Sequence, residues 1–124
     1  MVEDETDAVD INLGCPQGIA KKGNYGSFLL EKPDVIVAMT RALYINLKVP
    51  VTCKIRVLDD LDKTLELVKR IERAGASILT VHGRTKEQNK LKVGYCDWNY
   101  IKIIKETVKI PVFANGGVYT YSDV

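Results

Sequence analysis

Short apolar segments alternate with longer amphipathic segments along this chain, and the pattern predicts strands separated by helices. Four segments have the length and apolar content of buried strands: residues 8–13, 51–56, 77–82 and 112–114. Between them, apolar residues recur at helical spacing, as at Ile36, Met39 and Leu43. This strand–helix order predicts an α/β fold with a parallel sheet and right-handed crossovers.

The helix boundaries are marked by residues with a physical reason to stand there. Pro33 and Asp34 suit a first turn, because Pro lacks an N–H and Asp favours the positive end of a helix. The next helix is predicted over about residues 61–74, with Gly75 as its C-terminal stop. Asp97 is predicted to cap a third helix.

The segments between these elements are predicted to be loops. Three glycines lie in residues 16–32, which predicts a long loop with a short helical turn at 27–30. A polar loop is expected after the third strand, through Lys92. Thr120 or Ser122 is expected to cap a further helix.

Polar groups stand at the end of each predicted strand, and their distribution separates two architectures. They are Asn12 and Cys15, Lys54 and Arg56, His82 and Arg84, and Asn115. An open doubly wound sheet would usually carry a glycine-rich phosphate turn, which the sequence lacks, whereas barrel enzymes gather such groups at one face. Four strands cannot close a barrel of about 250 residues. We therefore expect a partial (β/α)8 TIM barrel, the central fragment of one.

Composition and charge set broad limits. The chain has 124 residues with a net charge of +2, which fits one domain and gives no special argument for a polyanion-binding surface. No membrane-spanning run and no signal peptide are expected. The three cysteines have no CxxC spacing, which disfavours a disulfide framework or a zinc site. A reducing cytoplasmic or nuclear setting is expected.

Cys15 is the first candidate for chemistry. Gly14 and Pro16 flank it just past the first strand, so it should lie on a rigid turn with its sulfur facing outward. A thiol there could donate a proton or act as a nucleophile. Cys53, inside a strand, is predicted to be a small buried side chain.

Two pairs of basic residues are spaced two apart at neighbouring strand ends, Lys54 with Arg56 and His82 with Arg84. Each pair should share one face of its strand. Cations pointing into a barrel need an anionic or polar partner, which a cofactor or substrate would supply. An anionic or electron-rich ring system is the expected ligand, and no metal is expected.

Two further motifs are weaker candidates. The glycines of Asn115-Gly116-Gly117 would let the backbone approach a ligand closely, although a simple turn is an equally fair interpretation. Lys21 and Lys22, in the loop after Cys15, could contact phosphates, although exposed lysines are usually just solvated.

In order along the chain, the sequence resembles the tRNA-dihydrouridine synthases. The most specific match is Asn12-Leu13-Gly14-Cys15-Pro16-Gln17 with the downstream Gly23-Asn24-Tyr25-Gly26. The likeness continues at residues 51–56, 79–85 and 111–116, and looks most like the eukaryotic members that act on D-loop uridines 16 and 17.

The resemblance implies an FMN-dependent oxidoreductase that uses NADPH or NADH to reduce uridines of tRNA. Hydride would pass from reduced FMN to C6 of the uracil ring, and Cys15 would protonate C5. Lys54 matches the lysine beside the flavin and His82 the histidine near it. The target uridine must leave its stack to reach such a pocket.

Other positions match with less specific roles. Asn115 and Gly116 match the loop near the cofactor phosphate, and Asn12, Arg56 and Arg84 match polar positions around flavin and substrate. Gly117, also expected at the cofactor, departs from the Asn or Asp of many relatives.

The resemblance implies that the family's first strands, last two strands and helical tRNA-binding domain are missing from this sequence. Residues 1–124 are therefore expected to form part of an FMN-dependent TIM-barrel catalytic domain, with weak or no FMN binding and no turnover alone. Two alternatives stay open: another FMN barrel such as a dihydroorotate dehydrogenase, or an inactive half-barrel that self-associates through exposed sheet edges.

Overall fold

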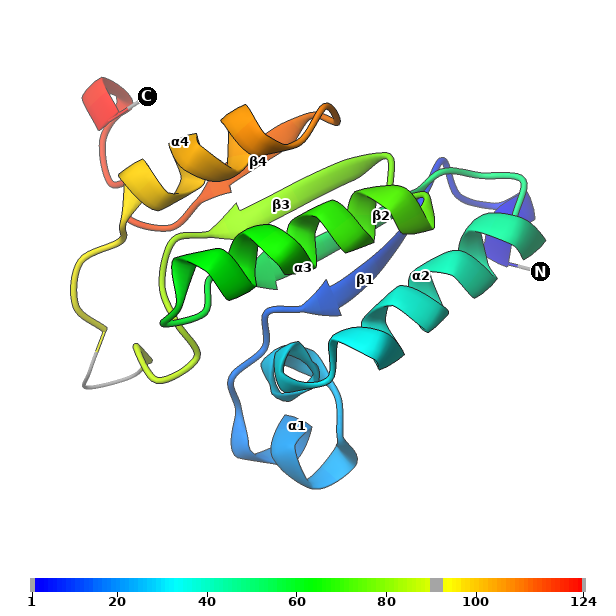
Figure 1. Ribbon diagram of the computed structural model, residues 1–124, viewed down its shortest axis with the longest axis horizontal. Helices are drawn as coiled ribbons and strands as arrows, with labels where there is room; N and C mark the ends of the chain where they lie inside the picture. The colour runs from blue at the N-terminus through cyan, green and yellow to red at the C-terminus, as the bar shows by residue number, and fades with distance from the viewer. Residues whose placement is uncertain (1, 90–92, 124) are drawn as a thin grey trace.

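A computed structural model describes residues 2–89 and 93–123. Its four strands form one parallel sheet in the order β1-β2-β3-β4 (Figure 1). They are β1 (Val9–Leu13), β2 (Val51–Arg56), β3 (Ile78–His82) and β4 (Val112–Asn115). The predicted strands and their parallel pairing are confirmed. The predicted loop end at Lys92 lies outside the described residues.

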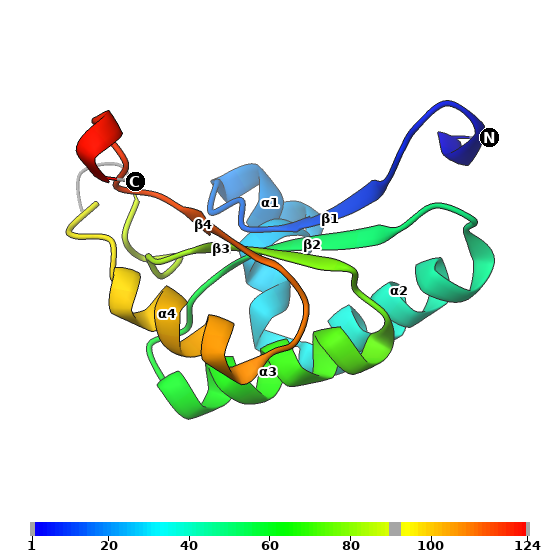
Figure 2. The same ribbon diagram turned by 90° about the horizontal axis from the view of Figure 1, so that it is seen from above.

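Three longer helices cover one face of the sheet (Figure 2). They are α2 (Pro33–Asn46), α3 (Leu61–Ala74) and α4 (Trp98–Thr107). A doubly wound sheet would place helices on both faces, whereas a barrel places them all outside. The sequential strand order and the one-sided helices confirm a partial (β/α) barrel.

The predicted helix boundaries also hold. The Asp60 Oδ1 accepts a hydrogen bond from the Lys63 N–H at 3.0 Å and caps α3, which ends at Gly75 with φ 110°. The Asp97 Oδ1 accepts from the Tyr100 N–H at 2.9 Å and caps α4. Each cap satisfies a backbone donor that the first helical turn leaves without a partner.

The long loop predicted over 16–32 is wrong in part, because it contains two short helices, α1 (Gly18–Gly23) and η2 (Gly26–Glu31). Six residues are too few for an apolar period to be read, and glycines usually indicate a break. The turn predicted at 27–30 lies within η2.

Two further 3-10 helices lie near the chain ends, η1 (Val2–Asp4) and η4 (Tyr121–Asp123). The Asp123 Oδ2 accepts from the backbone N–H groups of Tyr119 at 2.8 Å and Thr120 at 2.7 Å. The cap expected from Thr120, directly before η4, is wrong, because its hydroxyl bonds the Ser122 hydroxyl at 2.9 Å instead of a backbone N–H. A helix capped by Ser122 would lie outside the described residues.

The core lies between the sheet and helices α2, α3 and α4 (Figure 2). Its strand side chains alternate along β1, β2 and β3 and are at most 7% exposed: Ile11, Leu13, Cys53, Ile55, Leu79 and Val81. In α2, Ile36 packs in this core, but Met39 of the predicted apolar stripe is 37% exposed. Thr40 is buried instead, because its Oγ1 donates to the Ile36 carbonyl at 2.8 Å. No helix among residues 2–89 and 93–123 is long and apolar enough to cross a membrane.

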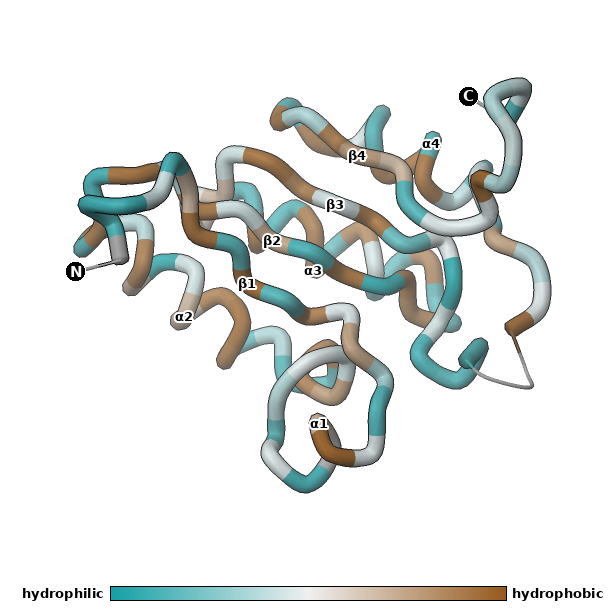
Figure 3. The backbone as a smooth tube through the Cα atoms, turned by 180° about the vertical axis from the view of Figure 1, so that it is seen from behind, coloured by the Kyte–Doolittle hydropathy of each residue, from teal (hydrophilic) through white to brown (hydrophobic). Residues whose placement is uncertain are grey.

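The opposite face of the sheet carries the alternate residues and is free of α2, α3 and α4 (Figure 3). Its polar members include Asn12, Lys54, Thr80 and His82. In a closed barrel this face would point inward. We call it the open face.

Candidate active site at the carboxyl edge of the sheet

Strand register brings the predicted polar residues together. Asn12 of β1 lies beside Lys54 of β2. Arg56 at the end of β2 lies beside His82 of β3, which lies beside Asn115 of β4. Because the strands are parallel, all these groups meet at one edge of the sheet.

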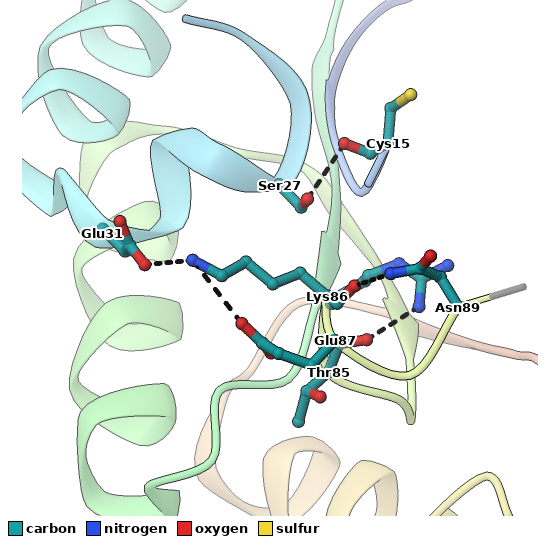
Figure 4. A network of polar contacts seen from close by, with 8 residues as sticks. Cys15, Ser27, Glu31, Thr85, Lys86, Glu87 and Asn89 are labelled. Carbon is teal, nitrogen blue, oxygen red and sulfur yellow. Dashed lines mark hydrogen bonds and ion pairs between the residues drawn. The ribbon is translucent and has the colours of Figure 1, made fainter. Parts of the chain in front are cut away.

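Cys15 lies on a turn that is fixed on both sides. The Asn12 Oδ1 accepts from the Gly14 N–H at 3.0 Å, and the Cys15 carbonyl accepts from both the N–H and the Oγ of Ser27 at 2.9 Å. Gly26 has φ 64°, and a Cβ there would lie 2.5 Å from the Cys15 carbonyl oxygen. The partly exposed thiol points away from Ser27 (Figure 4).

Lys54 places its ammonium beside this turn. A Cβ at Gly14 would lie 3.1 Å from the Lys54 Nζ, so the glycine makes room for the cation. Burial, and next the charge of Arg56, lower the pKa of Lys54. Among the described residues, no hydrogen bond or ion pair joins this ammonium. The open face therefore presents a partly buried cation with a place for an anionic or polar ligand.

Arg56 obtains its partners from the chain itself. Its Nε donates to the Gly14 carbonyl at 2.8 Å, and its Nη1 to the carbonyls of Thr85 at 3.0 Å and Gln88 at 3.4 Å. The side chain is 9% exposed. The expectation that a cofactor or substrate supplies its polar partner is wrong for these donors, since backbone carbonyls do so.

His82 is electrically neutral at pH 7. Burial is the main cause that lowers its pKa to about 4, and the charges of Arg56, Lys54 and Arg84 act in the same direction. The Arg84 Nη1 lies 3.4 Å from the His82 Nε2. Because a guanidinium only donates, Nε2 accepts and the ring proton is on Nδ1.

The loop of Asn115, Gly116 and Gly117 packs tightly on its surroundings. Gly116 has φ 96°, and a Cβ there would lie 2.5 Å from the ring of His82. The Trp98 Nε1 donates to the Gly116 carbonyl at 2.9 Å, and the Cys96 Sγ contacts the Asn115 carbonyl at 3.6 Å. The glycines are therefore required by space and by backbone conformation.

Arg84 is 8% exposed and lies at the far side of this site. Its Nε donates to the Gly94 carbonyl at 3.1 Å and its Nη2 to the Tyr119 hydroxyl at 3.5 Å. Together with Tyr95 and Trp98 these residues line a cavity of about 460 Å³.

A larger cavity of about 560 Å³ lies beside α3, lined by residues such as Leu30, Val57 and Lys86 and by none of the predicted site residues. Lys22 is exposed on α1. The side chain of Lys21 lies outside the described residues. Within the described part of the chain, no group of three or more His, Cys, Asp or Glu side chains is placed to hold a metal.

Four residues that support the site were not among the predicted site residues: Gly26, Ser27, Cys96 and Trp98. Gly26 is the last residue of the Gly-x-Tyr-Gly motif quoted above. It lies next to the Cys15 carbonyl, which leaves no room for a side chain at this position. Nothing in the sequence pairs Trp98 with Gly116, because the bond spans 18 positions and ends on a backbone oxygen.

A parallel sheet with helices on one side and reactive groups at successive carboxyl ends defines part of a barrel enzyme's catalytic face. The sequence model of the family described as "Dihydrouridine synthase (Dus)" matches residues 1–124. The chain belongs to the dihydrouridine synthase family.

Two similar proteins have the numbers 16/17 in their names. The chain is 49% identical over 124 residues to "tRNA-dihydrouridine(16/17) synthase [NAD(P)(+)]-like" of Mus musculus, and covers 26% of that protein. It is 51% identical over 126 residues to "tRNA-dihydrouridine(16/17) synthase [NAD(P)(+)]" of Saccharomyces cerevisiae, and covers 30% of it. In both alignments 100% of this chain is matched, so it corresponds to less than a third of either relative.

A solved structure supports the fold alone. A prophage protein of the dihydrodipicolinic acid synthase family from E. coli K12 superposes with a TM-score of 0.62 at 20% identity. The superposition covers 91% of this chain and 34% of that protein, as a segment of a barrel would.

Proposed function

We propose that the protein carrying this chain reduces uridine in tRNA to 5,6-dihydrouridine, and that residues 1–124 form part of its FMN-dependent barrel domain. The supporting observation is the partly exposed Cys15 turn beside the Lys54 ammonium, in a chain matched throughout by the dihydrouridine synthase family. The names of the relatives favour D-loop uridines 16 and 17 as targets and NADPH or NADH as the reductant.

The residues at the carboxyl edge fit a flavin. Lys54 offers a cation without a partner among the described residues, and Gly116 and Gly117, with φ of 96° and 76°, let the loop after β4 pack against His82 and Cys96 at the same edge of the sheet. Lys54, His82 and the loop from Asn115 to Gly117 would hold FMN. When bound and reduced, FMN would supply hydride to C6 of the uracil ring.

Cys15 would supply the second hydrogen. Saturating the C5=C6 bond requires one hydride and one proton, and the Sγ–H of Cys15 would place the proton on C5. The thiolate left behind would lie near the Lys54 ammonium, because the Lys54 Nζ lies beside this turn, 3.1 Å from where a Cβ of Gly14 would be. A proton from solvent would restore the thiol.

His82 and Asn12 would shape the site without carrying net charge. Neutral His82 offers an Nδ1–H donor, because its Nε2 accepts from Arg84. The Asn12 Oδ1 accepts from the Gly14 N–H and so holds the turn. Its Nδ2 would be the group that donates to a ligand.

The experiment is a Cys15→Ala substitution in the protein carrying this sequence, with dihydrouridine in tRNA measured by mass spectrometry of digested nucleosides. We expect the rate to fall about 10²–10⁴-fold, the usual share of a general acid. Cys53→Ala is the matched control, because that thiol is buried on the helix side of the sheet. An unchanged dihydrouridine level in Cys15→Ala would refute the general-acid role.

The isolated chain would also have two uncovered strand edges, on β1 and β4. We propose that residues 1–124 alone self-associate through these edges, since the unpaired backbone N–H and C=O groups of an edge strand can form hydrogen bonds with a second chain. Gel filtration tests this: a monomer at all concentrations would contradict it.

A further inference from the structure

One buried side chain, Arg56, ties two loops of the site together. Its Nε donates to the Gly14 carbonyl, one residue before Cys15, at 2.8 Å. Its Nη1 donates to the Thr85 carbonyl at 3.0 Å and the Gln88 carbonyl at 3.4 Å. The guanidinium therefore joins the turn after β1 to the loop after β3.

A second connection joins the same two regions. Lys86 forms an ion pair with Glu31 of η2 (Figure 4). Its Nζ also lies 5.6 Å from the centre of the Phe28 ring of the same helix. The same short helix carries Ser27, which donates twice to the Cys15 carbonyl. The loop that begins at Thr85 thus supports the Cys15 turn through two routes.

The positions of these bonds have a geometric consequence. A peptide unit is planar, so a hydrogen bond to its carbonyl oxygen restrains the orientation of the whole unit. Arg56 holds the carbonyl of Gly14, and Ser27 holds the carbonyl of Cys15. These two units flank the Cys15 Cα, so together they set its φ and ψ and the direction of its Cβ. Only rotation about χ1 remains free.

We propose that Arg56 is a positioning residue that aims the Cys15 thiol by holding the Gly14 carbonyl against the loop after β3. This role rests on the proposed function, in which Cys15 donates the proton. It requires the planar guanidinium, whose donors reach carbonyls in different directions at fixed spacing. A lysine keeps the charge but is a single point donor and cannot make the same fork.

The test is Arg56→Lys in the protein carrying this sequence, with two readouts. Because misplacing a reacting group by about 1 Å costs on the order of 10²-fold, kcat for dihydrouridine formation should fall by about that factor while KM for tRNA stays unchanged. Alkylation of Cys15 by iodoacetamide, followed by peptide mass spectrometry, should become several-fold faster as the turn loosens. Arg70→Lys is the control, since Arg70 bonds Asp34 at 2.5 Å between helices; both readouts should match the parent protein.

Cys53 provides a check on folding within the same sample. It is fully buried in the core, so its resistance to alkylation reports that the variant is folded. If Arg56→Lys is folded and alters neither kcat nor the alkylation of Cys15, the positioning role is wrong. A rise in KM alone also contradicts it, because that result would place Arg56 in substrate binding.

A measurement on the unchanged protein covers the case in which Arg56→Lys does not fold. The Arg56 Nε–H, held by the Gly14 carbonyl, should exchange with solvent far more slowly by NMR than the Nε–H of exposed arginines such as Arg41. Equal exchange rates overturn the proposal. If the unchanged protein forms no dihydrouridine, the proposed function fails, while exchange and alkylation still decide whether Arg56 holds the turn.

Discussion

The two faces of the sheet are built from neighbouring residues and have opposite properties. On the helix side, Ile55, Leu79 and Val81 are fully buried. On the open face, Lys54, Thr80 and His82 keep partial exposure to solvent. The difference follows from the two-residue period of a strand, which sends adjacent side chains to opposite faces. One face stabilises the fold, and the other displays polar groups.

The open face is itself divided along the strands. At its amino end, the Thr52 Oγ1 donates to the Asp10 Oδ1 at 2.7 Å, so these groups satisfy each other. At its carboxyl end, the Lys54 ammonium has no partner among the described residues, and burial lowers its pKa. Polar groups without protein partners cost stability, and they are therefore the ones expected to meet a ligand.

The largest predicted difference between the faces is in the free energy of unfolding. Leu79→Ala removes a fully buried side chain and should destabilise the protein carrying this sequence by about 2–5 kcal/mol. Thr80→Ala, one residue along on the open face, should cost less than about 1 kcal/mol, within the range of strand propensity. Urea unfolding of the two variants measures both. Equal losses would mean that the open face is also packed in the native protein.

The next prediction concerns pH and comes from His82. Its pKa is about 4 in the folded chain against an ordinary value of 6.5, so between these values the unfolded state binds more protons. Stability should therefore fall as the pH is lowered from 6.5 toward 4. Solvent screening limits the loss to roughly 1–2 kcal/mol. Urea unfolding at a series of pH values measures it.

A His82→Gln variant supplies the comparison, because glutamine keeps a polar side chain but does not titrate. Its stability should change less with pH over this window than that of the parent protein. Identical pH profiles for the two proteins would show that other groups, and not His82, account for the acid sensitivity.

The sequence predicts the sheet well because strand burial depends on local alternation. Each strand was located to within one or two residues, and Asp97 caps α4 as predicted. Helix α1 was missed because six residues that begin and end with glycine carry no readable period. Met39 was misplaced because helical spacing alone does not reveal that Thr40 satisfies its hydroxyl within the helix.

The site was predictable as a set of side chains but not as a set of contacts. Parallel strands bring their carboxyl ends together, so the meeting of Arg56, His82 and Asn115 follows from the strand order. The partners of Arg56 did not follow, because they are backbone carbonyls 42 and 29 positions away. Every residue has a backbone carbonyl, so the sequence does not show which of them accepts a hydrogen bond. Arg56 was therefore expected to bind a ligand.

Of the substitutions proposed here, Lys54→Met should change the free energy of unfolding least. It therefore gives the clearest contrast between the open face and the core. Lys54→Met removes a partly buried ammonium and keeps an unbranched side chain, so unfolding free energy should change by less than about 0.5 kcal/mol. FMN affinity, measured by quenching of flavin fluorescence, should fall by about tenfold or more, the value of a lost charge-assisted hydrogen bond. Lys102→Met, on the exposed side of α4, should change neither. A stability loss like that of Leu79→Ala would instead assign Lys54 to the structure, and the open face would lose its distinction from the core.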